Sequence, residues 1–248
     1  MPRIFALGGG GFSMEPDNPV LDELIIAAAA ANRPGAAGRR PRVCFLPTAS
    51  GDAESYVERF EAAFVARDCE TSVLNLFSRT VSDLAAFIAG QDLVYVGGGN
   101  TPNMVAIWRT HGLDVVLRDA WQNGVVLAGV SAGANCWFEA STTDGWGNGI
   151  GAYNDGLGLL SGSFTPHYDG EAKRRSKLHQ LVADGFAEGL ALGDGSAAVF
   201  EGTELVECVG SHADAVAFRV TRANRASNDG AVIETALPVR ILLRGGGA

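Results

Sequence analysis

The stretch Val125-Val126-Leu127-Ala128-Gly129-Val130-Ser131-Ala132-Gly133 decides the fold of this 248-residue chain. Its first four residues form an apolar run with β-branched side chains, which is typical of a buried strand. Residues 132–139 can continue as a helix, so Ser131 falls on the turn between strand and helix. A serine on such a turn is held with its hydroxyl clear of the sheet. We therefore predict that Ser131 is the nucleophile of an α/β hydrolytic enzyme.

The small residues around Ser131 support this interpretation. Gly129 and Gly133 leave room for the strand and the helix to approach closely. The turn aims the first N–H groups of the helix, including that of Ala132, at the space beside the hydroxyl, and this forms part of an oxyanion hole. A tight turn capped by a serine would show the same five residues, because glycine is abundant here with 33 residues. The position between a strand and a helix favours the catalytic interpretation.

Short β-rich runs alternate with longer helical segments on either side of this stretch. The alternation predicts an α/β fold, a mostly parallel sheet flanked by helices. A helix at 173–182 precedes a β-rich C-terminal part, which we expect to pack on the same sheet. Residues 1–248 should form a single domain, with 245–248 frayed. The predicted strands are 4–7, 43–46, 71–74, 93–96, 125–128, 197–200, 205–209, 215–220 and 239–243, and the other predicted helices are 20–31, 54–67, 82–89, 103–109 and 114–122.

Composition excludes several classes of protein. The formal net charge is −9, and an acidic chain without a basic face is a poor ligand for nucleic acid or anionic membranes. No apolar stretch is long enough to span a membrane, and the first residues lack the apolar region of a signal peptide, so we expect a cytoplasmic protein. Cys44, Cys69, Cys136 and Cys208 are far apart and form no CxxC pair. We expect no disulfide framework, no metal and no cofactor.

Two glycine-rich segments follow predicted strands, at the strand ends where open α/β sheets bind ligands. Gly97-Gly98-Gly99-Asn100-Thr101 and Gly8-Gly9-Gly10-Gly11 could hold an anion with their backbone N–H groups. Neither has the spacing of a phosphate loop or of a dinucleotide fingerprint. We therefore prefer Gly98 as an N–H donor to a substrate oxyanion over a purely structural turn. Asn100 and Thr101 are substrate-binding candidates.

Ser131 needs a base, and histidine is the usual one near neutral pH. Of the four histidines, His111 ends a polar helix, His179 lies within the 173–182 helix, and His212 lies in a loop predicted to be exposed. His167 differs because Pro166 restricts the backbone before it and fixes the direction of the imidazole. We predict that His167 is the general base.

A carboxylate should hold the imidazole in the correct tautomer. Asp194 lies on a glycine-flanked turn that leads into a predicted strand. Asp169 is only two residues after His167, so it could reach the back of the imidazole ring only through a tight turn. Asp144 and Glu171 are further candidates. Spacing along the chain leaves the choice open.

The ordered motifs at 97–101, 129–134 and 166–169 resemble the peptidase E family of serine peptidases, which contains aspartyl dipeptidases and, more distantly, cyanophycinases. The resemblance extends from residue 4 to about residue 200. It implies a flavodoxin-like or class I glutamine-amidotransferase-like fold. It also implies a cytoplasmic peptidase without a metal, which cleaves dipeptides that begin with aspartate.

The resemblance also assigns residues. Ser131 matches the family nucleophile and His167 its histidine. Asp194 falls where a glutamate occurs in the family triad, which makes it the preferred acid, and Asp144 resembles another proposed position. Lys173 stands where the family's substrate-binding arginine is expected; Arg174 or Arg175 could take that role if the helix phase differs.

Two other functions fit the same residues. One is a cyanophycinase-like or other serine hydrolase with a different substrate. The other is a non-catalytic module that binds a small anion in its glycine loops. The expected partner of the enzyme is a small peptide, and a homo-oligomer is compatible with the sequence.

Overall fold

The computed structural model describes residues 1–32, 38–223 and 232–243; the expectation for 245–248 lies outside this part of the chain. Its centre is an eight-stranded sheet with the order β14-β11-β10-β1-β5-β4-β2-β3. The five strands from β1 to β3 in this order pair in parallel, and β10 and β11 continue the sheet antiparallel. The strands are β1 (Arg3–Leu7), β2 (Arg42–Leu46), β3 (Glu70–Val73), β4 (Leu93–Val96), β5 (Val126–Val130), β10 (Ser196–Glu201), β11 (Glu204–Gly210) and β14 (Val239–Ile241).

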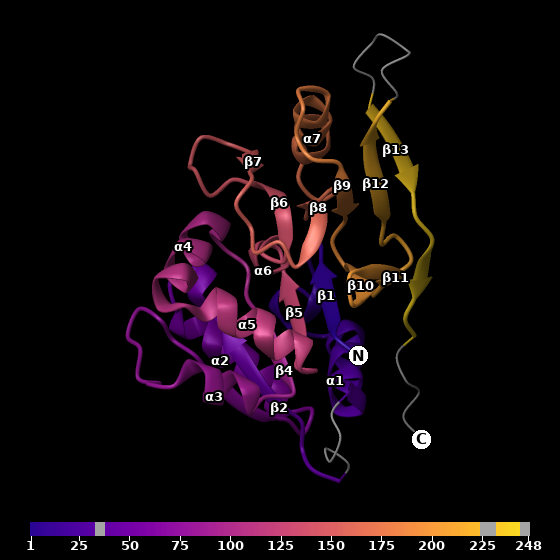
Figure 1. Cartoon of the computed structure of the whole chain (residues 1–248). Coiled ribbons are helices and arrows are strands. Elements are labelled where there is room, and N and C mark those ends of the chain that lie inside the picture. Colours follow the sequence, from indigo (N-terminus) through magenta and orange to yellow (C-terminus); the bar gives the residue numbers. More distant parts are fainter. Residues whose placement is uncertain (33–37, 224–231, 244–248) are drawn as a thin grey trace.

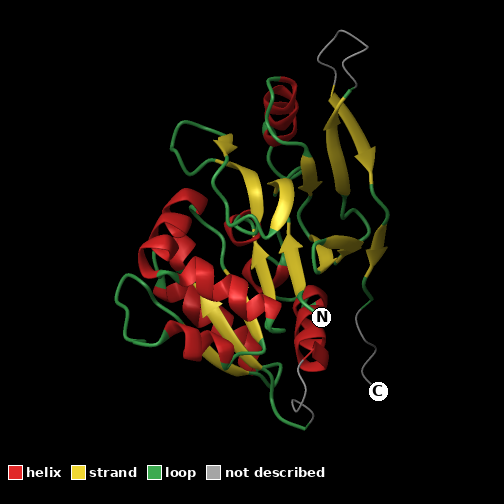
Figure 2. Ribbon diagram, viewed as in Figure 1, coloured by secondary structure: helices red, strands yellow, loops and turns green. Residues whose placement is uncertain are grey.

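Helices cover both faces of this sheet, as Figure 2 shows. Side chains alternate between the two faces of β5, so Leu127 belongs to one apolar cluster while Val126 and Ala128 belong to the other. Both faces are therefore buried, which explains the continuous apolar run in the sequence. The helices α3 (Leu84–Ala89), α4 (Thr101–His111) and α5 (Leu113–Gln122) cover the Leu127 face, and α1 (Val20–Asn32) and α2 (Glu54–Val65) cover the other.

A second, six-stranded sheet has the order β13-β12-β9-β8-β6-β7. It lies above β1 and β5 in Figure 1, with α7 (Arg174–Ala183) at its upper end. The short helix α6 (Ala132–Asn135) contacts strands of both sheets. The strands of this sheet are β6 (Phe138–Thr143), β7 (Gly151–Tyr153), β8 (Leu160–Thr165), β9 (Gly189–Leu192), β12 (Ala217–Arg222) and β13 (Val232–Ala236).

The second sheet corrects two expectations. The helix predicted at 132–139 ends at Asn135, and Phe138 already begins β6, which pairs with the distant strand β8. The C-terminal strands were all expected on one sheet, but β12 pairs with β9 in the second sheet, while β10, β11 and β14 do join the first. Both errors arise because pairing partners far apart in sequence decide which sheet a short apolar run joins.

Gly129 and Gly133 occupy the closest backbone contact in the turn after β5. A Cβ added to Gly129 would overlap the carbonyl of Gly133, and one added to Gly133 would overlap the carbonyl of Val96. Both atoms are backbone and cannot swing away. The turn from β5 through Ser131 into α6 therefore requires glycine at these two positions.

We expect Gly129→Ala to lower the free energy of unfolding by about 2 kcal/mol or more, because the added methyl forces the strand and helix apart. Urea denaturation measures this. Gly90→Ala is the matched control: a Cβ there meets its nearest atom at an ordinary 3.4 Å, so its effect should stay within about 0.5 kcal/mol. Equal losses in the two variants would contradict the argument.

Candidate active site

Ser131 has the strained backbone expected at the end of β5. Its φ of 56° and ψ of −114° are unusual for a residue with a side chain. The strain is held in place because the Ser131 N–H donates to the Leu7 carbonyl of β1 at 3.1 Å, and the Ser131 carbonyl accepts from Ala134 and Asn135 in α6. Strain maintained by its surroundings is typical of functional positions. The sequence prediction of a strand–serine–helix turn is thus met by the geometry.

His167 lies just beyond β8, and the chain holds it close to the same edge of the first sheet. Its backbone also has positive φ, 52°, and its N–H donates to the Gly8 carbonyl at 3.0 Å. Leu7, which binds Ser131, directly precedes Gly8. Consecutive carbonyls at the end of β1 therefore anchor the backbones of Ser131 and His167.

Asp194 holds the His167 ring. The Nδ1 atom of His167 lies 2.6 Å from Oδ1 of Asp194, a short charge-assisted hydrogen bond. The turn that carries Asp194 is tied to the same segment, since the N–H of Gly195 donates to the Gly9 carbonyl at 3.1 Å. The His167 side chain is 15% exposed and that of Asp194 35%, so the ring is largely buried but remains reachable.

Gly9 is a site residue that sequence reasoning missed. A Cβ added at this position would collide with the carboxylate of Asp194 and lie 3.0 Å from Nδ1 of His167. Only glycine lets the pair sit directly against the β1 loop. In the sequence, the glycines at 8–11 indicated only a possible anion-binding loop; their position at the end of the strand beside β5 was the available signal.

The other acidic candidates lie elsewhere. Asp169 accepts a hydrogen bond from the Asp194 N–H at 3.2 Å, so it supports the acid turn and does not hold the ring. Glu171 pairs with Arg174. Asp144 is exposed after β6, and its side chain has no hydrogen bond or ion pair among the described residues. The structure thus places Asp194, and not Asp144, on the imidazole.

Gly98 and Ala132 flank Ser131 as expected, but their N–H groups differ. A Cβ added to Gly98 would lie 3.4 Å from the Cβ of Ser131, so this loop adjoins the nucleophile. The Gly98 N–H donates to the hydroxyl of Tyr56 at 3.1 Å. The Ala132 N–H has no acceptor among the residues that the structure describes. Ala132 is therefore a free donor, whereas Gly98 must first exchange its partner.

Asn100 and Thr101 have structural partners. The side chain of Asn100 caps α4 by accepting from Asn103 N–H at 2.9 Å and donates to the Gly145 carbonyl at 2.8 Å. Thr101 is buried, and its hydroxyl accepts from Asn135 at 3.2 Å. These contacts fasten the Gly97–Gly99 loop and the β6–β7 connection to α4 and α6. We find no support in them for direct substrate binding.

The three cations after His167 have different surroundings. Arg174 is only 3% exposed and is paired with Glu171 at 2.7 Å. Arg175 pairs with Glu234 and stacks over the rings of Tyr168 and Phe218. The Lys173 side chain has no ion pair or hydrogen bond in the described part of the chain. Lys173 is thus the one of the three that is available to an anionic ligand.

The remaining histidines and the cysteines have other roles. His179 lies 3.0 Å from the Tyr168 hydroxyl and 2.9 Å from Glu234, and His111 lies 3.4 Å from Arg79. His212 lies in a loop as expected, but its side chain is half-buried against Gly195 rather than exposed. The four cysteines are buried free thiols; burial raises the pKa of Cys44 to about 12 and that of Cys136 well above its usual value. They therefore stay protonated and are poor nucleophiles.

Residues 1–32, 38–223 and 232–243 contain no group of three or more His, Cys, Asp or Glu side chains that could hold a metal ion. In these same ranges, every helix is too short or too polar to cross a bilayer.

A strained serine after β5 and a hydrogen-bonded histidine–aspartate pair after β8 and β9 form an arrangement typical of hydrolases, and comparison with known proteins is consistent with it. Residues 4–208 match the model of peptidase family S51, and the chain belongs to this family. It is a peptidase with the flavodoxin-like fold of that family. The resemblance found in the sequence motifs is confirmed.

Individual relatives agree. The chain is 47% identical to the "Uncharacterized peptidase YgaJ" of Bacillus subtilis, over 98% of this chain and 100% of that protein. It is 30% identical to "Peptidase E" of Streptomyces coelicolor, over 80% and 83% of the two chains. A peptidase from an acI-B1 Actinobacterium has the same fold, with a TM-score of 0.66 at 19% identity, covering 89% and 91%. A putative peptidase E protein from Listeria monocytogenes gives 0.53 at 17% identity, covering 96% and 100%.

We expect Asp194→Asn to lower kcat on the order of 10³- to 10⁴-fold, because an amide can hold the His167 ring in the wrong tautomer. Steady-state peptide hydrolysis measures this. Asp144→Asn is the control and should leave kcat nearly unchanged. The reverse ranking of the two variants would assign the orienting acid to Asp144.

Proposed function

We propose that this protein is a serine peptidase that hydrolyses small peptides, and in particular dipeptides with an N-terminal aspartate, through an acyl-enzyme on Ser131. The observation that carries the proposal is the 2.6 Å contact of His167 Nδ1 with Asp194, anchored to the same β1 loop as the strained Ser131. Membership of family S51 supports peptide-bond hydrolysis. The serine mechanism and the dipeptide preference are our inference from the site.

The proposed reaction follows from the atoms available. With Nδ1 of His167 bonded to Asp194, Nε2 is left to accept the Ser131 hydroxyl proton as the oxygen attacks the scissile carbonyl. The Ala132 N–H, which has no acceptor in the described part of the chain, stabilises the oxyanion. His167 then donates that proton to the leaving amine. In the second half of the reaction His167 takes a proton from water as the water attacks the acyl-enzyme ester, and it returns this proton to the Ser131 oxygen.

Lys173 supports the aspartate preference. It directly precedes α7, the helix that follows the His167 loop, and the N–H of Glu171 in the intervening turn donates to the His167 carbonyl at 3.2 Å. The Lys173 ammonium, which has no partner among the described residues, is the cation of this segment that can pair with the side-chain carboxylate of an N-terminal aspartate. A lysine binds as a point charge rather than in the bidentate way of an arginine, so we expect moderate selectivity.

We expect Ser131→Ala to lower kcat by on the order of 10⁴-fold or more with little change in KM, since binding groups remain while the nucleophile is lost. Steady-state hydrolysis of Asp-Leu, monitored by the amino group that is released, measures kcat and KM. Ser55→Ala, an exposed serine on α2, is the control and should keep full activity. Full Asp-Leu hydrolysis by Ser131→Ala would refute the proposed nucleophile, and labelling of Ser131 by a fluorophosphonate would exclude a non-catalytic module.

A dipeptide panel tests the substrate class. Wild-type kcat/KM should be about tenfold or more higher for Asp-Leu than for Ala-Leu, because one charge-assisted contact is at stake, and Lys173→Gln should reduce this ratio. Lys177→Gln, a lysine farther along α7, is the control. A preference for a β-aspartyl-arginine dipeptide would favour a cyanophycinase-like activity, and equal rates for Asp-Leu and Ala-Leu would contradict the aspartate preference.

In the free enzyme, Tyr56 accepts the hydrogen bond of Gly98, the second proposed oxyanion donor. Its ring is buried against Phe12 and Phe45, and its hydroxyl accepts the Gly98 N–H. For Gly98 to serve the oxyanion, this hydrogen bond must break, at a net cost of about 1 kcal/mol. We infer that the Tyr56 hydroxyl accepts the Gly98 N–H only in the free enzyme, and that the substrate oxygen replaces it as the acceptor.

Tyr56→Phe should therefore keep kcat/KM or raise it by up to about fivefold, since Gly98 no longer has a competing acceptor. Steady-state kinetics of Asp-Leu hydrolysis measure kcat/KM, and the midpoint of thermal unfolding checks that the variant is folded. A loss on the order of a hundredfold in a folded variant would mean instead that the phenol donates its proton to the transition state.

A further inference from the structure

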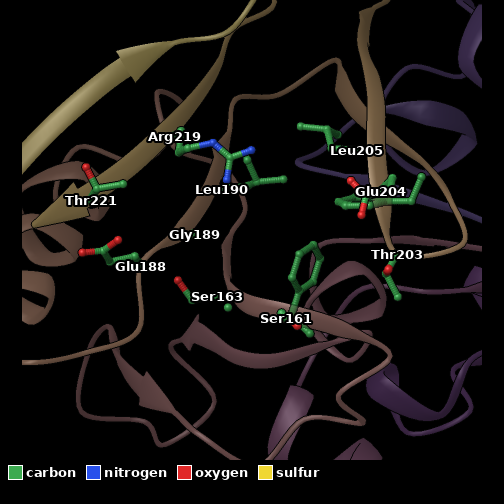
Figure 3. A pocket seen from close by; sticks show the side chains of 13 residues that line it. Ser161, Ser163, Glu188, Gly189, Leu190, Thr203, Glu204, Leu205, Arg219 and Thr221 are labelled. Atoms are coloured by element: carbon green, nitrogen blue, oxygen red, sulfur yellow. The ribbon is translucent and has the colours of Figure 1, made fainter.

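A second cavity of about 410 Å³ lies away from the Ser131 site. It opens between the beginnings of β8 and β9, the strand β12 and the β10–β11 turn (Figure 3). His167 and Asp194 follow the opposite, carboxyl ends of β8 and β9. Ser163 is the last residue of β8 that lines the cavity, and the four residues from it to His167 span on the order of 13 Å at about 3.3 Å per residue. The cavity is thus distinct from the catalytic edge.

One wall of this cavity carries an unpaired cation. The side chain of Arg219 in β12 has no hydrogen bond, ion pair or ring contact in the described part of the chain, and its guanidinium points into the cavity in Figure 3. By contrast, Arg174 and Arg175, in the segment after His167, are both paired with glutamates. In a chain with net charge −9, an arginine that lines a cavity and has no carboxylate partner among the described residues is available to bind an anion.

The opposite wall carries negative charge. Glu204 lies at the β10–β11 turn and faces Arg219 across the cavity in Figure 3, yet the two side chains form no ion pair. Glu188 on a third wall is partly satisfied, because it accepts the Arg222 N–H at 2.8 Å. The separated Arg219 and Glu204 leave room between them for a molecule with both a carboxylate and an ammonium.

Apolar side chains form the floor between the two charges. Phe138, Leu190 and Phe200 are buried beneath it, and Leu205 closes one side. We propose that this cavity is a second site that binds a free amino acid zwitterion with an apolar side chain: the carboxylate binds Arg219, the ammonium binds Glu204, and the side chain contacts the floor. This site does not depend on the proposed catalytic mechanism.

Calorimetric titration of the full-length protein with L-leucine tests the proposal. 4-Methylpentanoate lacks the ammonium and 3-methylbutylamine lacks the carboxylate, so these two probes separate the charges. We expect L-leucine to bind with a Kd on the order of 1 mM, and each single-charge probe to bind about tenfold or more weakly. Absence of L-leucine binding at about 10 mM, or equal binding of 4-methylpentanoate, would overturn the proposal.

Variants locate the binding. Arg219→Gln and Glu204→Gln should each weaken L-leucine binding about tenfold or more, because each removes one charge-assisted contact. Arg240→Gln is the matched control, since Arg240 is an exposed β14 arginine paired with Glu207 outside this cavity. Ser131→Ala should bind L-leucine as the wild type does. Unchanged binding in folded Arg219→Gln would place the ligand elsewhere and refute the site.

Discussion

Three consecutive carbonyl groups at the end of β1 hold the candidate active site together. The carbonyls of Leu7, Gly8 and Gly9 accept the N–H groups of Ser131, His167 and Gly195 at 3.1, 3.0 and 3.1 Å. Each donor belongs to a different loop. A buried backbone hydrogen bond is directional, and losing one leaves a polar group unpaired, so this short ladder fixes three loops relative to one another.

The ladder also explains why glycine follows β1. The three loops can approach the segment only if it carries no side chain in their path, and at Gly9 a Cβ would displace the Asp194–His167 pair itself. The same constraint recurs at Gly129 and Gly133, where the backbone of the Ser131 turn packs closely on itself and on β4. Close backbone approach, rather than anion binding, accounts for these glycines.

The second sheet supplies two of the three candidate catalytic side chains. β8 leads into the His167 loop and β9 into the Asp194 turn, and these strands pair in parallel with each other. Ser131 comes from the first sheet, and α6 packs between the two. The site thus lies where the sheets meet, and positions of the strands in both sheets decide whether the three groups converge.

Much of the first sheet was predictable because β1, β2, β4 and β5 are largely apolar and helices separate the strands; β3 is more polar, but all five parallel strands fall within a residue or two of their expected bounds. The second sheet was not, since β7 and β9 are short, β7, β8 and β9 all contain glycine, and their burial depends on distant partners. In the site, the strand–Gly–x–Ser–x–Gly–helix pattern pointed to Ser131, and Pro166 singled out His167. The choice of Asp194 rested on family resemblance, and only its contact with the ring separates it from Asp144.

The sequence by itself determined the α/β class and the serine turn, because both depend on local patterns: apolar periodicity, and small residues where a strand must turn sharply into a helix. Tertiary structure alone decided which carboxylate meets His167, that Tyr56 occupies Gly98, and that Arg174 and Arg175 are already neutralised while Lys173 is not. These outcomes depend on residues that are distant in the chain or lie on helix faces whose phase the sequence leaves open. A charge or a donor becomes available or unavailable only when folding brings its partner within hydrogen-bonding distance.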